Sequence, residues 1–356
     1  MKVALLISGG VDSSVALKIL KDQGHDVTAF YLKIWLQDEF SFLGNCPWEE
    51  DVEYVTKVCS QLGVPFNIVP MQNEYWDKVV SYTIREVESG RTPNPDIFCN
   101  AFIKFGLFYD KIDHSYERIA TGHYAARAEI NGRYALKLTP DSVKDQTYFL
   151  SYLSQDQLKR AMFPLGDADK KEVRRIAAEA NLPTKDKKDS QGICFLGQIK
   201  FKDFLKQHLG TRPGDLVDIE TGRVMGKHEG YYFFTIGQRQ GIGLNKGPWY
   251  VVAKDAANNI IYISNNKDLV EKDKDHFYIT NFNWFLNRFP DNRNLRVKIR
   301  HGARSYKCTA EQLADDYGII QLETTDYGIA PGQYAVFYQD NICLGAAMIA
   351  EPRVTL

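Results

Sequence analysis

Residues 3–20, VALLISGGVDSSVALKIL, decide the fold of this chain, because they join a short apolar run to a helical pattern through a tight turn. Gly9 and Gly10 allow backbone N–H groups to approach an anion, and the start of the following helix carries partial positive charge. The alternative is a plain strand-to-helix turn that Asp12 or Ser13 caps. The turn therefore predicts a phosphate site, although it lacks the GK[ST] ending of a Walker A loop.

Outward from this turn, the N-terminal part alternates short apolar runs with helical stretches, which is typical of a parallel sheet with crossover helices. The predicted strands are Val3–Ile7, Val27–Leu32, Phe66–Val69 and Glu117–Ala120. Cys59 lies on the apolar face of a helical pattern that ends at Gly63, so we predict that it belongs to the core. Two alternating runs joined by Asn131-Gly132 predict a β-hairpin that leaves the sheet.

The C-terminal part follows another pattern, with glycine-rich turns, short β-like runs and no long helical period after about Leu209. Just before it, DADKKEVRRIAAEANLP predicts a helix that Asp167 or Asp169 caps and Pro183 ends. We therefore expect a first domain that closes near residue 200, followed by one or two small β-rich domains. The charged segment EKDKDH indicates a boundary near Lys274.

The composition of the whole chain is that of an ordinary globular protein, with 356 residues, 44% of them hydrophobic, and a formal net charge of −1. No apolar run approaches the roughly 18 residues of a membrane span, and Val3–Ile7 is shorter than the core of a signal peptide. The six cysteines are scattered and form no zinc-type pair, so we expect a reducing cytoplasm. The net charge neither favours nor excludes a nucleic-acid partner.

The segment RTPNPDIFCN, residues 91–100, raises the question whether its cysteine is a core residue or a reactive thiol. Asn94 is a good N-cap and Pro95 suits the first helical position, so Cys99 is predicted in or just after the first helical turn. The helix start favours the Cys99 thiolate, whereas the charge of Asp96 opposes it. A carboxyl and thiol pair of this kind suits proton transfer.

A second cysteine, Cys194, lies in the apolar run of KDSQGICFLG. A cysteine in such a run is most often buried in the core. The preceding cations Lys185, Lys187 and Lys188 would lower the pKa of its thiol if they faced it. Cys46, in NCPWEED, has no assignable chemistry, and we expect it in a surface loop.

The segment RNLRVKIRHGARSYK, residues 293–307, alternates apolar and basic residues as a strand with two unlike faces would. Its apolar residues are Leu295, Val297 and Ile299, and its outward residues would be Arg296, Lys298 and Arg300. With His301, Arg304 and Lys307 nearby, this face predicts a surface that follows nucleic-acid phosphates. The alternative is a solvated β-face without a ligand.

Several motifs occur together along the chain: SGGVDSS, GRTPNPDIFCN, TGHYA, KDQTYFL, KKDSQGICFLG, TIGQRQGIG and PGQYAVFY. In this order they resemble the tRNA-specific 2-thiouridylase (tRNA-uridine 2-sulfurtransferase) family, and SGGVDSS resembles the loop of ATP pyrophosphatases. The resemblance implies an α/β fold with an N-terminal parallel-sheet adenine-nucleotide-binding domain, a small β-rich central domain and a C-terminal β-barrel that contacts tRNA. We place these domains at residues 1–203, 204–274 and 275–356.

The resemblance also implies roles for individual residues. The nucleotide would be bound by Ser8, Gly9, Gly10, Val11, Asp12, Ser13, Leu32 and Gly122. Catalysis would use Asp96 in acid–base chemistry, Cys194 as the persulfide carrier and Cys99 as the second cysteine. Contacts with tRNA would come from Asn94, Pro95, Asp96, His123, Lys144, Asp145, Gln146, Arg300, His301 and Gln333. Leu32 departs from the methionine common in the family, which a backbone contact would tolerate.

The predicted reaction is ATP-dependent 2-thiolation of the wobble uridine of tRNA, through adenylation of O2 and transfer of persulfide sulfur to C2. The implied cofactor is ATP with Mg²⁺, without a protein-held metal. The implied partners are tRNA and a persulfide donor, either a sulfur-relay protein or a cysteine desulfurase, and the protein would act as a cytoplasmic monomer. Two alternatives stay open, an ATP-dependent amidating ligase with the same loop and an inactive tRNA-binding protein.

Overall fold

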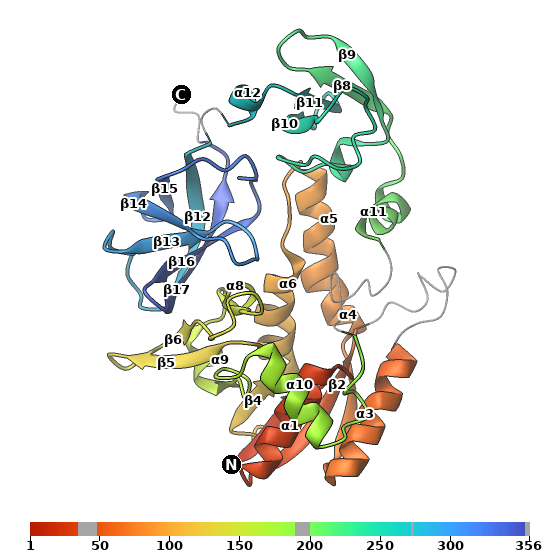
Figure 1. The fold of residues 1–356 in the computed structure, drawn as a ribbon, viewed down its shortest axis with the longest axis vertical. Coiled ribbons are helices and arrows are strands. Elements are labelled where there is room, and N and C mark those ends of the chain that lie inside the picture. The colour runs from red at the N-terminus through yellow and green to blue at the C-terminus, as the bar shows by residue number, and fades with distance from the viewer. Residues whose placement is uncertain (35–47, 189–199, 272–273, 353–356) are drawn as a thin grey trace.

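The computed structural model describes residues 1–34, 48–188, 200–271 and 274–352. Cys46 and Cys194 therefore lie outside the described residues, as does the predicted surface loop around Cys46. Figure 1 shows three parts: an N-terminal α/β part at the bottom, a β-barrel at the upper left and a small β-rich part at the top. The α/β class and the order of the three parts agree with the prediction from the sequence.

The N-terminal sheet has five parallel strands in the order β3-β2-β1-β4-β7. Their bounds are β1 Lys2–Leu6, β2 Asp26–Lys33, β3 Phe66–Pro70, β4 Arg118–Thr121 and β7 Ala161–Met162. The four strands predicted from apolar runs are confirmed, each within two residues at its ends. The short β7 was not predicted, because two residues carry no periodicity.

Helices cover both faces of this sheet because alternate residues of β1 point to opposite sides. Val3 and Leu5 pack with one helical layer, whereas Ala4 and Leu6 pack with the other. The first layer contains α1 Val11–Asp22, α3 Trp48–Leu62 and α10 Lys170–Glu179. The second contains α4 Gln72–Tyr75, η2 Trp76–Val80, α5 Ser81–Glu88, α6 Pro95–Phe98, η3 Cys99–Leu107 and α7 Phe108–Asp110. Cys59, on α3, is buried in the first layer, as predicted.

The predicted hairpin is formed by β5 Ala126–Ile130 and β6 Arg133–Lys137. Asn131 and Gly132 have φ values of 50° and 73°, as the two central residues of a type I′ turn require. The hairpin leaves the N-terminal sheet and joins the barrel, because Leu136 pairs with Cys343 of β17. After it come α8 Thr147–Leu150, α9 Gln155–Arg160 and α10, and α10 is capped by Asp169, one of the two predicted residues.

The central part is built on a four-stranded sheet in the order β10-β11-β8-β9. Its elements are α11 Phe201–Leu209, β8 Gly214–Asp218, β9 Val224–His228, η4 Tyr231–Phe233, β10 Tyr250–Asp255, β11 Ile260–Ser264 and α12 Lys267–Glu271. The hydroxyl of Tyr231 donates to the backbone oxygen of Glu88 at 2.5 Å, which ties this part to the end of α5. Figure 1 shows α5 rising from the N-terminal part toward it.

The C-terminal part is a closed barrel, because β12 pairs with β17 as well as with β15. Its elements are β12 His276–Trp284, β13 Leu295–Lys298, β14 Tyr306–Ala314, β15 Tyr317–Leu322, β16 Tyr334–Gln339 and β17 Ile342–Ala350. Val297, Ile320 and Phe337 are among the buried residues of its own core. Another apolar cluster continues from the N-terminal part into the barrel and includes Cys99 and Tyr334.

The prediction of a basic outer face over residues 295–300 is wrong for Lys298, which is buried. Val297, Lys298 and Ile299 are 0%, 6% and 1% exposed, so the alternation of buried and exposed residues stops there. The ammonium of Lys298 lies 3.9 Å from a carboxylate oxygen of Asp145 and over the ring of Tyr338. The strand is covered at this point by the N-terminal part, which a local pattern cannot indicate.

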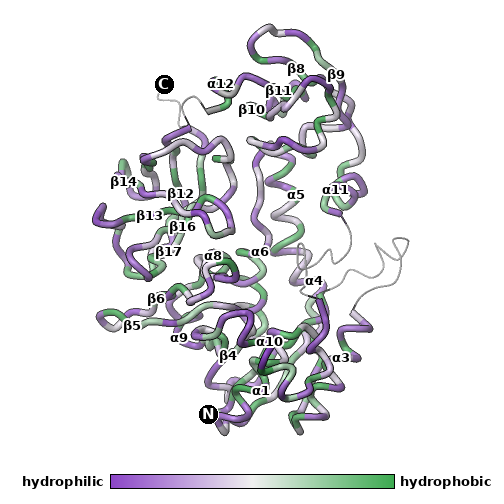
Figure 2. Tube along the Cα trace, in the orientation of Figure 1, coloured by the Kyte–Doolittle hydropathy of each residue, from purple (hydrophilic) through white to green (hydrophobic). Residues whose placement is uncertain are grey.

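Hydrophobic and hydrophilic stretches alternate along the chain in all three parts (Figure 2). Among the described residues, no helix combines the length and the apolar character needed to cross a membrane.

Candidate active site

The predicted phosphate loop lies at the carboxyl end of β1, where the order of the sheet reverses. β1 pairs in parallel with β2 on one side and with β4 on the other, so the chain departs from β1 in two directions. Ligands of open α/β sheets bind in the crevice at such a point. Gly9 has a φ of 74°, in the left-handed region that glycine adopts without strain.

The start of α1 has backbone N–H groups that no side chain caps. Its N-cap is Gly10, and no side chain caps it, so neither Asp12 nor Ser13 makes the plain capped turn of the alternative reading. The hydroxyl of Ser13 instead donates to the backbone oxygen of Gly10 and accepts from the N–H of Ser8, each at 3.2 Å. These bonds fix the shape of the loop at the start of the helix.

Asp12 has two partners that sequence reasoning did not find. The hydroxyl of Tyr124 donates to Oδ1 of Asp12 at 2.8 Å, and the ammonium of Lys170 lies 2.7 Å from the same oxygen. Lys170 is the first residue of α10, in a basic segment whose pattern is equally typical of the solvent-exposed face of a helix. Nothing in the local sequence indicates that its side chain contacts residue 12.

Gly122 follows the end of β4 and contacts the phosphate loop. A Cβ atom at this position would lie 2.7 Å from the backbone nitrogen of Ser13, so the two segments touch through their backbones. The next residue, His123, shares a hydrogen bond of 2.8 Å between its Nδ1 and the hydroxyl of Thr121. Burial, with the nearby charge of Lys104, holds the pKa of the His123 imidazole well below its ordinary value of 6.5. His123 is therefore neutral at pH 7.

The start of α3 packs on the phosphate loop and connects it to the segment before Cys194. A Cβ on Gly9 would lie 2.7 Å from the backbone oxygen of Asp51. The ammonium of Lys187 lies 2.7 Å from the carboxylate of Asp51. The chain is thus held beside the loop at residue 187, and Cys194 itself lies outside the described residues. Leu32 is half-buried near the end of β2, at the same edge of the sheet.

The segment that carries Cys99 begins a helix as predicted. Asn94 accepts a hydrogen bond from the N–H of Ile97 at 3.4 Å, and Pro95 occupies the first helical position. Cys99 follows the first turn and is 1% exposed, whereas Asp96 is half-buried. From Cys99 the chain continues as the π-helix η3 rather than as the plain helix that the apolar spacing indicated. Such wide turns are frequent at functional sites.

The barrel forms several hydrogen bonds with the turn at residues 92–94, which precedes Cys99. The N–H of Thr92 donates to the backbone oxygen of Pro331 at 2.8 Å. The side-chain amide of Gln333 donates to the backbone oxygens of Pro93 at 2.9 Å and of Thr92 at 3.3 Å. The amide of Asn94 in turn donates to the side-chain oxygen of Gln333 at 3.3 Å. Asn94 and Gln333, both predicted to contact tRNA, are therefore neighbours.

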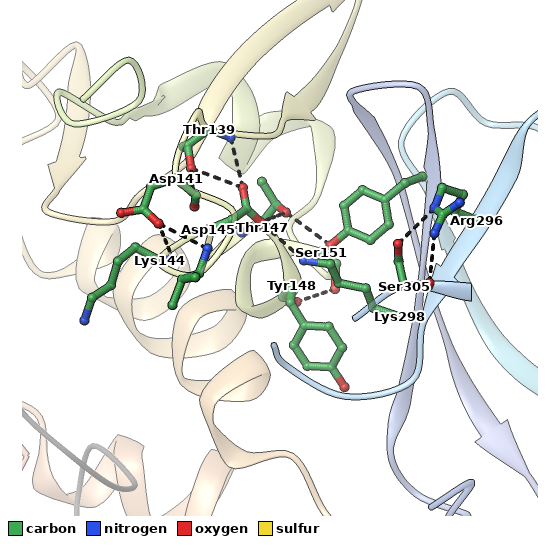
Figure 3. Close-up of polar contacts among 12 residues, drawn as sticks. Thr139, Asp141, Lys144, Asp145, Thr147, Tyr148, Ser151, Arg296, Lys298 and Ser305 are labelled. Carbon is green, nitrogen blue, oxygen red and sulfur yellow. Dashed lines mark hydrogen bonds and ion pairs between the residues drawn. The ribbon is translucent and has the colours of Figure 1, made fainter. Parts of the chain in front are cut away.

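A second contact between the N-terminal part and the barrel is centred on Asp145 (Figure 3). Its carboxylate is 1% exposed and accepts from the N–H of Thr139 at 3.0 Å and from the hydroxyl of Thr147 at 2.5 Å. Lys298 of the barrel approaches the same carboxylate at 3.9 Å. Asp145 thus holds the 139–147 segment in place, and any contribution to tRNA binding acts through that segment. Figure 3 shows the side chain of Lys144 extending away from this cluster.

The remaining predicted residues lie on either side of this contact. Gln146 is linked to the Gly122 segment, because its N–H donates to the backbone oxygen of Tyr124 at 2.8 Å. His301 is exposed, and its ring lies 4.4 Å from the ring of Phe149. Partial burial, with Lys298 and Lys144 nearby, lowers the pKa of His301. Arg300 is exposed beside it and pairs with Asp326. The predicted residues that the structure describes thus extend from the phosphate loop, through the 139–147 segment, to the edge of the barrel.

Fold and site together define an α/β nucleotide-binding domain whose candidate active-site segments are held by an attached β-barrel. Residues 1–198 match the family described as tRNA methyl transferase HUP domain. Residues 202–265 match the tRNA methyl transferase PRC-barrel domain, and residues 274–349 match the aminomethyltransferase beta-barrel domain.

Relatives match the chain over nearly its whole length. The tRNA-specific 2-thiouridylase MnmA of Parabacteroides distasonis is 45% identical, over 99% of each chain. That of Porphyromonas gingivalis is 42% identical over 99% of this chain and 100% of its own. A further one from Bacteroides fragilis is 41% identical over 98% of this chain and 100% of its own. The chain belongs to the tRNA-specific 2-thiouridylase family.

Proposed function

We propose that this protein is a tRNA-uridine 2-sulfurtransferase, which uses ATP to replace O2 of the wobble uridine of tRNA with sulfur. The observation that carries the proposal is a phosphate loop at the reversal point of the sheet, in a chain that aligns with 2-thiouridylases from end to end. The thiol chemistry of the reaction fits a compartment that keeps cysteines reduced, which the cytoplasm does.

The nucleotide is proposed to lie at the carboxyl end of the sheet, beside the phosphate loop and Gly122. The uncapped start of α1 is proposed to supply N–H donors for its phosphates, and the backbone contact between Gly122 and Ser13 holds the end of β4 against the loop. Leu32, at the same edge of the sheet, is placed to line the adenine. Mg²⁺ is proposed to enter with the nucleotide and to neutralise the charge of its phosphates, without a metal ligand from the protein.

The first chemical step is proposed to be adenylation of the uridine. O2 of the base attacks the α-phosphate, a new O–P bond forms, and pyrophosphate leaves with the electrons of the broken bond. A uridine paired or stacked in the anticodon loop cannot reach this centre, so the base is extruded. Asn94, Pro95 and Asp96 are proposed to contact it, because the barrel fixes their turn through Gln333.

The second step is proposed to be sulfur transfer from Cys194, which receives a persulfide from a sulfur-relay protein or a cysteine desulfurase. The terminal sulfur attacks C2 of the base and AMP departs. Cys99 then attacks the S–S bond, which releases 2-thiouridine and leaves a Cys99–Cys194 disulfide. In the alternative order, Cys99 attacks the persulfide first, which forms the same disulfide and frees hydrosulfide to attack C2. Either order consumes two reducing equivalents, so turnover needs a thiol reductant. Asp96, in the first turn of the same helix as Cys99, is proposed to transfer the proton.

The tRNA is proposed to bind along the edge where the 139–147 segment meets the barrel. Lys144 belongs to that segment, the ring of His301 lies 4.4 Å from that of Phe149, and Arg300 is the exposed residue before His301. Lys298 is removed from the predicted set of phosphate contacts, because it is buried.

Pyrophosphate release tests this proposal against its two alternatives. The account predicts release that requires both ATP and a tRNA with an unmodified wobble uridine. An amidating ligase would release pyrophosphate without tRNA once its own substrate and ammonia are present. An inactive tRNA-binding protein would bind the tRNA and release none, and either result would overturn the proposal.

A further inference from the structure

A buried carboxylate on the barrel lies beneath the exposed arginines next to His301. The side chain of Asp326 is 1% exposed, whereas that of Arg300 is 48% exposed. Nη2 of Arg300 donates to Oδ2 of Asp326 at 2.5 Å, and the hydroxyl of Tyr306 donates to the same oxygen. The N–H of Gly328 donates to Oδ1 at 2.7 Å. A carboxylate with this many donors is held in one orientation and can orient its partners.

The guanidinium of Arg300 is confined from a second side by the backbone. A Cβ atom on Gly328 would lie 2.0 Å from Nη1 of Arg300, so the guanidinium rests directly on this glycine. A free arginine side chain samples many rotamers, and binding a ligand must then order it. Arg300 is instead held by Asp326 and Gly328 while it stays reachable from solvent.

A second arginine shares the arrangement. Arg304 lies 4.6 Å above the ring of Tyr306, and its Nη1 is 4.0 Å from Oδ2 of Asp326. Its side chain is 67% exposed. Burial and the bond to Asp326 raise the pKa of Tyr306 to about 12, so its phenol stays protonated and donates at neutral pH. Asp326 thus organises Arg300 directly and Arg304 through Tyr306.

The guanidinium groups of Arg300 and Arg304, both held in place, are suited to binding a phosphate group. Arginine presents a planar fork of N–H donors that matches the oxygens of a phosphate group. Two arginines against one buried carboxylate leave a net positive charge at the surface. Asp326 lowers the positive charge of the site, which by itself would weaken the binding of a phosphate. Its presence is therefore better explained by its effect on the orientation of the arginines.

We propose that Asp326 is a positioning residue that orients Arg300, with Arg304 beside it, as a clamp for a phosphodiester group of the tRNA. The inference rests on the proposed function for the identity of the RNA and adds to it a residue that touches no RNA. Asp326 would act on binding through Arg300.

The variant Asp326→Asn separates positioning from charge. Its amide oxygen can still accept the hydrogen bond from the N–H of Gly328, so we expect the loop around residue 326 to fold. The negative charge that holds Arg300 is lost. Positioning predicts about tenfold weaker binding of an unmodified tRNA transcript, and a slope of log affinity against log salt that is shallower by about 1. Tighter binding with a steeper slope would mean that Asp326 only reduces the surface charge, and would overturn the proposal.

A double-mutant cycle tests whether Asp326 acts through Arg300. Arg300→Lys keeps the charge but loses the fork, and we expect it to weaken binding to the same extent as Asp326→Asn. In the Arg300→Lys background, Asp326→Asn should then cost little more. If the two losses multiplied instead, Asp326 would be acting on the fold or on other groups, and the clamp would be wrong.

Two further measurements distinguish a failure of the proposed clamp from a failure of the proposed function. If the wild-type protein makes 2-thiouridine while Asp326→Asn binds tRNA normally, the clamp fails and the function stands. Release of pyrophosphate at saturating tRNA should be unchanged in Asp326→Asn, because the residue lies on the barrel and not at the nucleotide. A loss of that activity at saturation would contradict a role confined to RNA binding.

Discussion

The side-chain amide of Gln333 lies 2.9 Å from the backbone oxygen of Pro93 and so joins the barrel to the turn that precedes Asp96 and Cys99. Gln333 stands between β15 and β16, far along the chain from the turn that it caps. The barrel thus shapes the turn that leads into the proposed catalytic residues, besides its proposed role in binding RNA. This relationship gives Gln333 a structural role beside its proposed contact with tRNA.

Replacing Gln333 with alanine should slow thiolation at saturating tRNA. The change leaves two backbone oxygens without their donor, at a cost of about 1–3 kcal/mol, and loosens the turn that carries Asp96. Gln339→Ala is a matched control, because its amide also donates to a backbone oxygen, that of Arg293 at 2.7 Å. Both variants should unfold at lower urea concentration than the wild type, and Gln333→Ala alone should lose turnover. Equal turnover in the two variants would refute the role of the turn.

The buried pair of Asp145 and Lys298 predicts an order of stabilities. Asp145→Ala leaves the ammonium of Lys298 buried beside a tyrosine ring and removes the acceptor of Thr139 and Thr147, so it should cost about 3–5 kcal/mol. Lys298→Met should cost less, because Asp145 keeps its hydrogen-bond donors. Denaturant unfolding of both variants checks this order. The reverse order would show that Lys298 reaches water, as the alternating pattern first indicated.

The close backbone contact at Gly122 predicts that this position tolerates no side chain. In Gly122→Ala the new methyl group would lie 2.7 Å from the nitrogen of Ser13, which should destabilise the protein by about 1–3 kcal/mol and abolish nucleotide binding. Gly10→Ala serves as the control for stability, because its Cβ meets Ser8 at 3.6 Å and its φ of −89° suits alanine. Unfolding without ATP should separate the two variants. If both unfold alike, the backbone contact at Gly122 is not tight.

The depressed pKa of His123 predicts a loss of stability in acid. The folded state holds this pKa below the ordinary value of 6.5, so the unfolded chain takes up the proton first as the pH falls. The stabilising contribution is therefore complete above about pH 6.5 and declines below it. His123→Asn, which does not titrate, should show a flatter dependence of the unfolding midpoint between pH 7.5 and 5. Parallel curves for the two proteins would contradict this sign.

Local patterns were sufficient for those features that depend on neighbours in sequence. The strand-turn-helix unit at Gly9 and Gly10, the Asn131-Gly132 hairpin and the Asn94 cap each follow from the conformational preferences of a few adjacent residues. The core position of Cys59 follows from helical spacing alone.

Features that depend on distant partners could not be predicted in this way. Lys298 follows a regular alternation, and its burial is decided by Asp145, which belongs to another part of the chain. The partner of the hairpin strand β6 is β17, and the partners of Asp12 are Tyr124 and Lys170. The roles of Asp96, Cys99 and Cys194 came from resemblance to a family, since the helix start and the carboxyl group have opposing effects on the Cys99 thiol.

The central claim is tested most directly by the nucleosides of tRNA after incubation with the protein, ATP, a persulfide donor and a thiol reductant. The account predicts 2-thiouridine at the wobble position with the wild type, and none with Cys99→Ser or Cys194→Ser, although both variants should still bind tRNA. Asp96→Asn should retain tRNA binding with strongly reduced product. Undiminished 2-thiouridine from both cysteine variants would contradict the account.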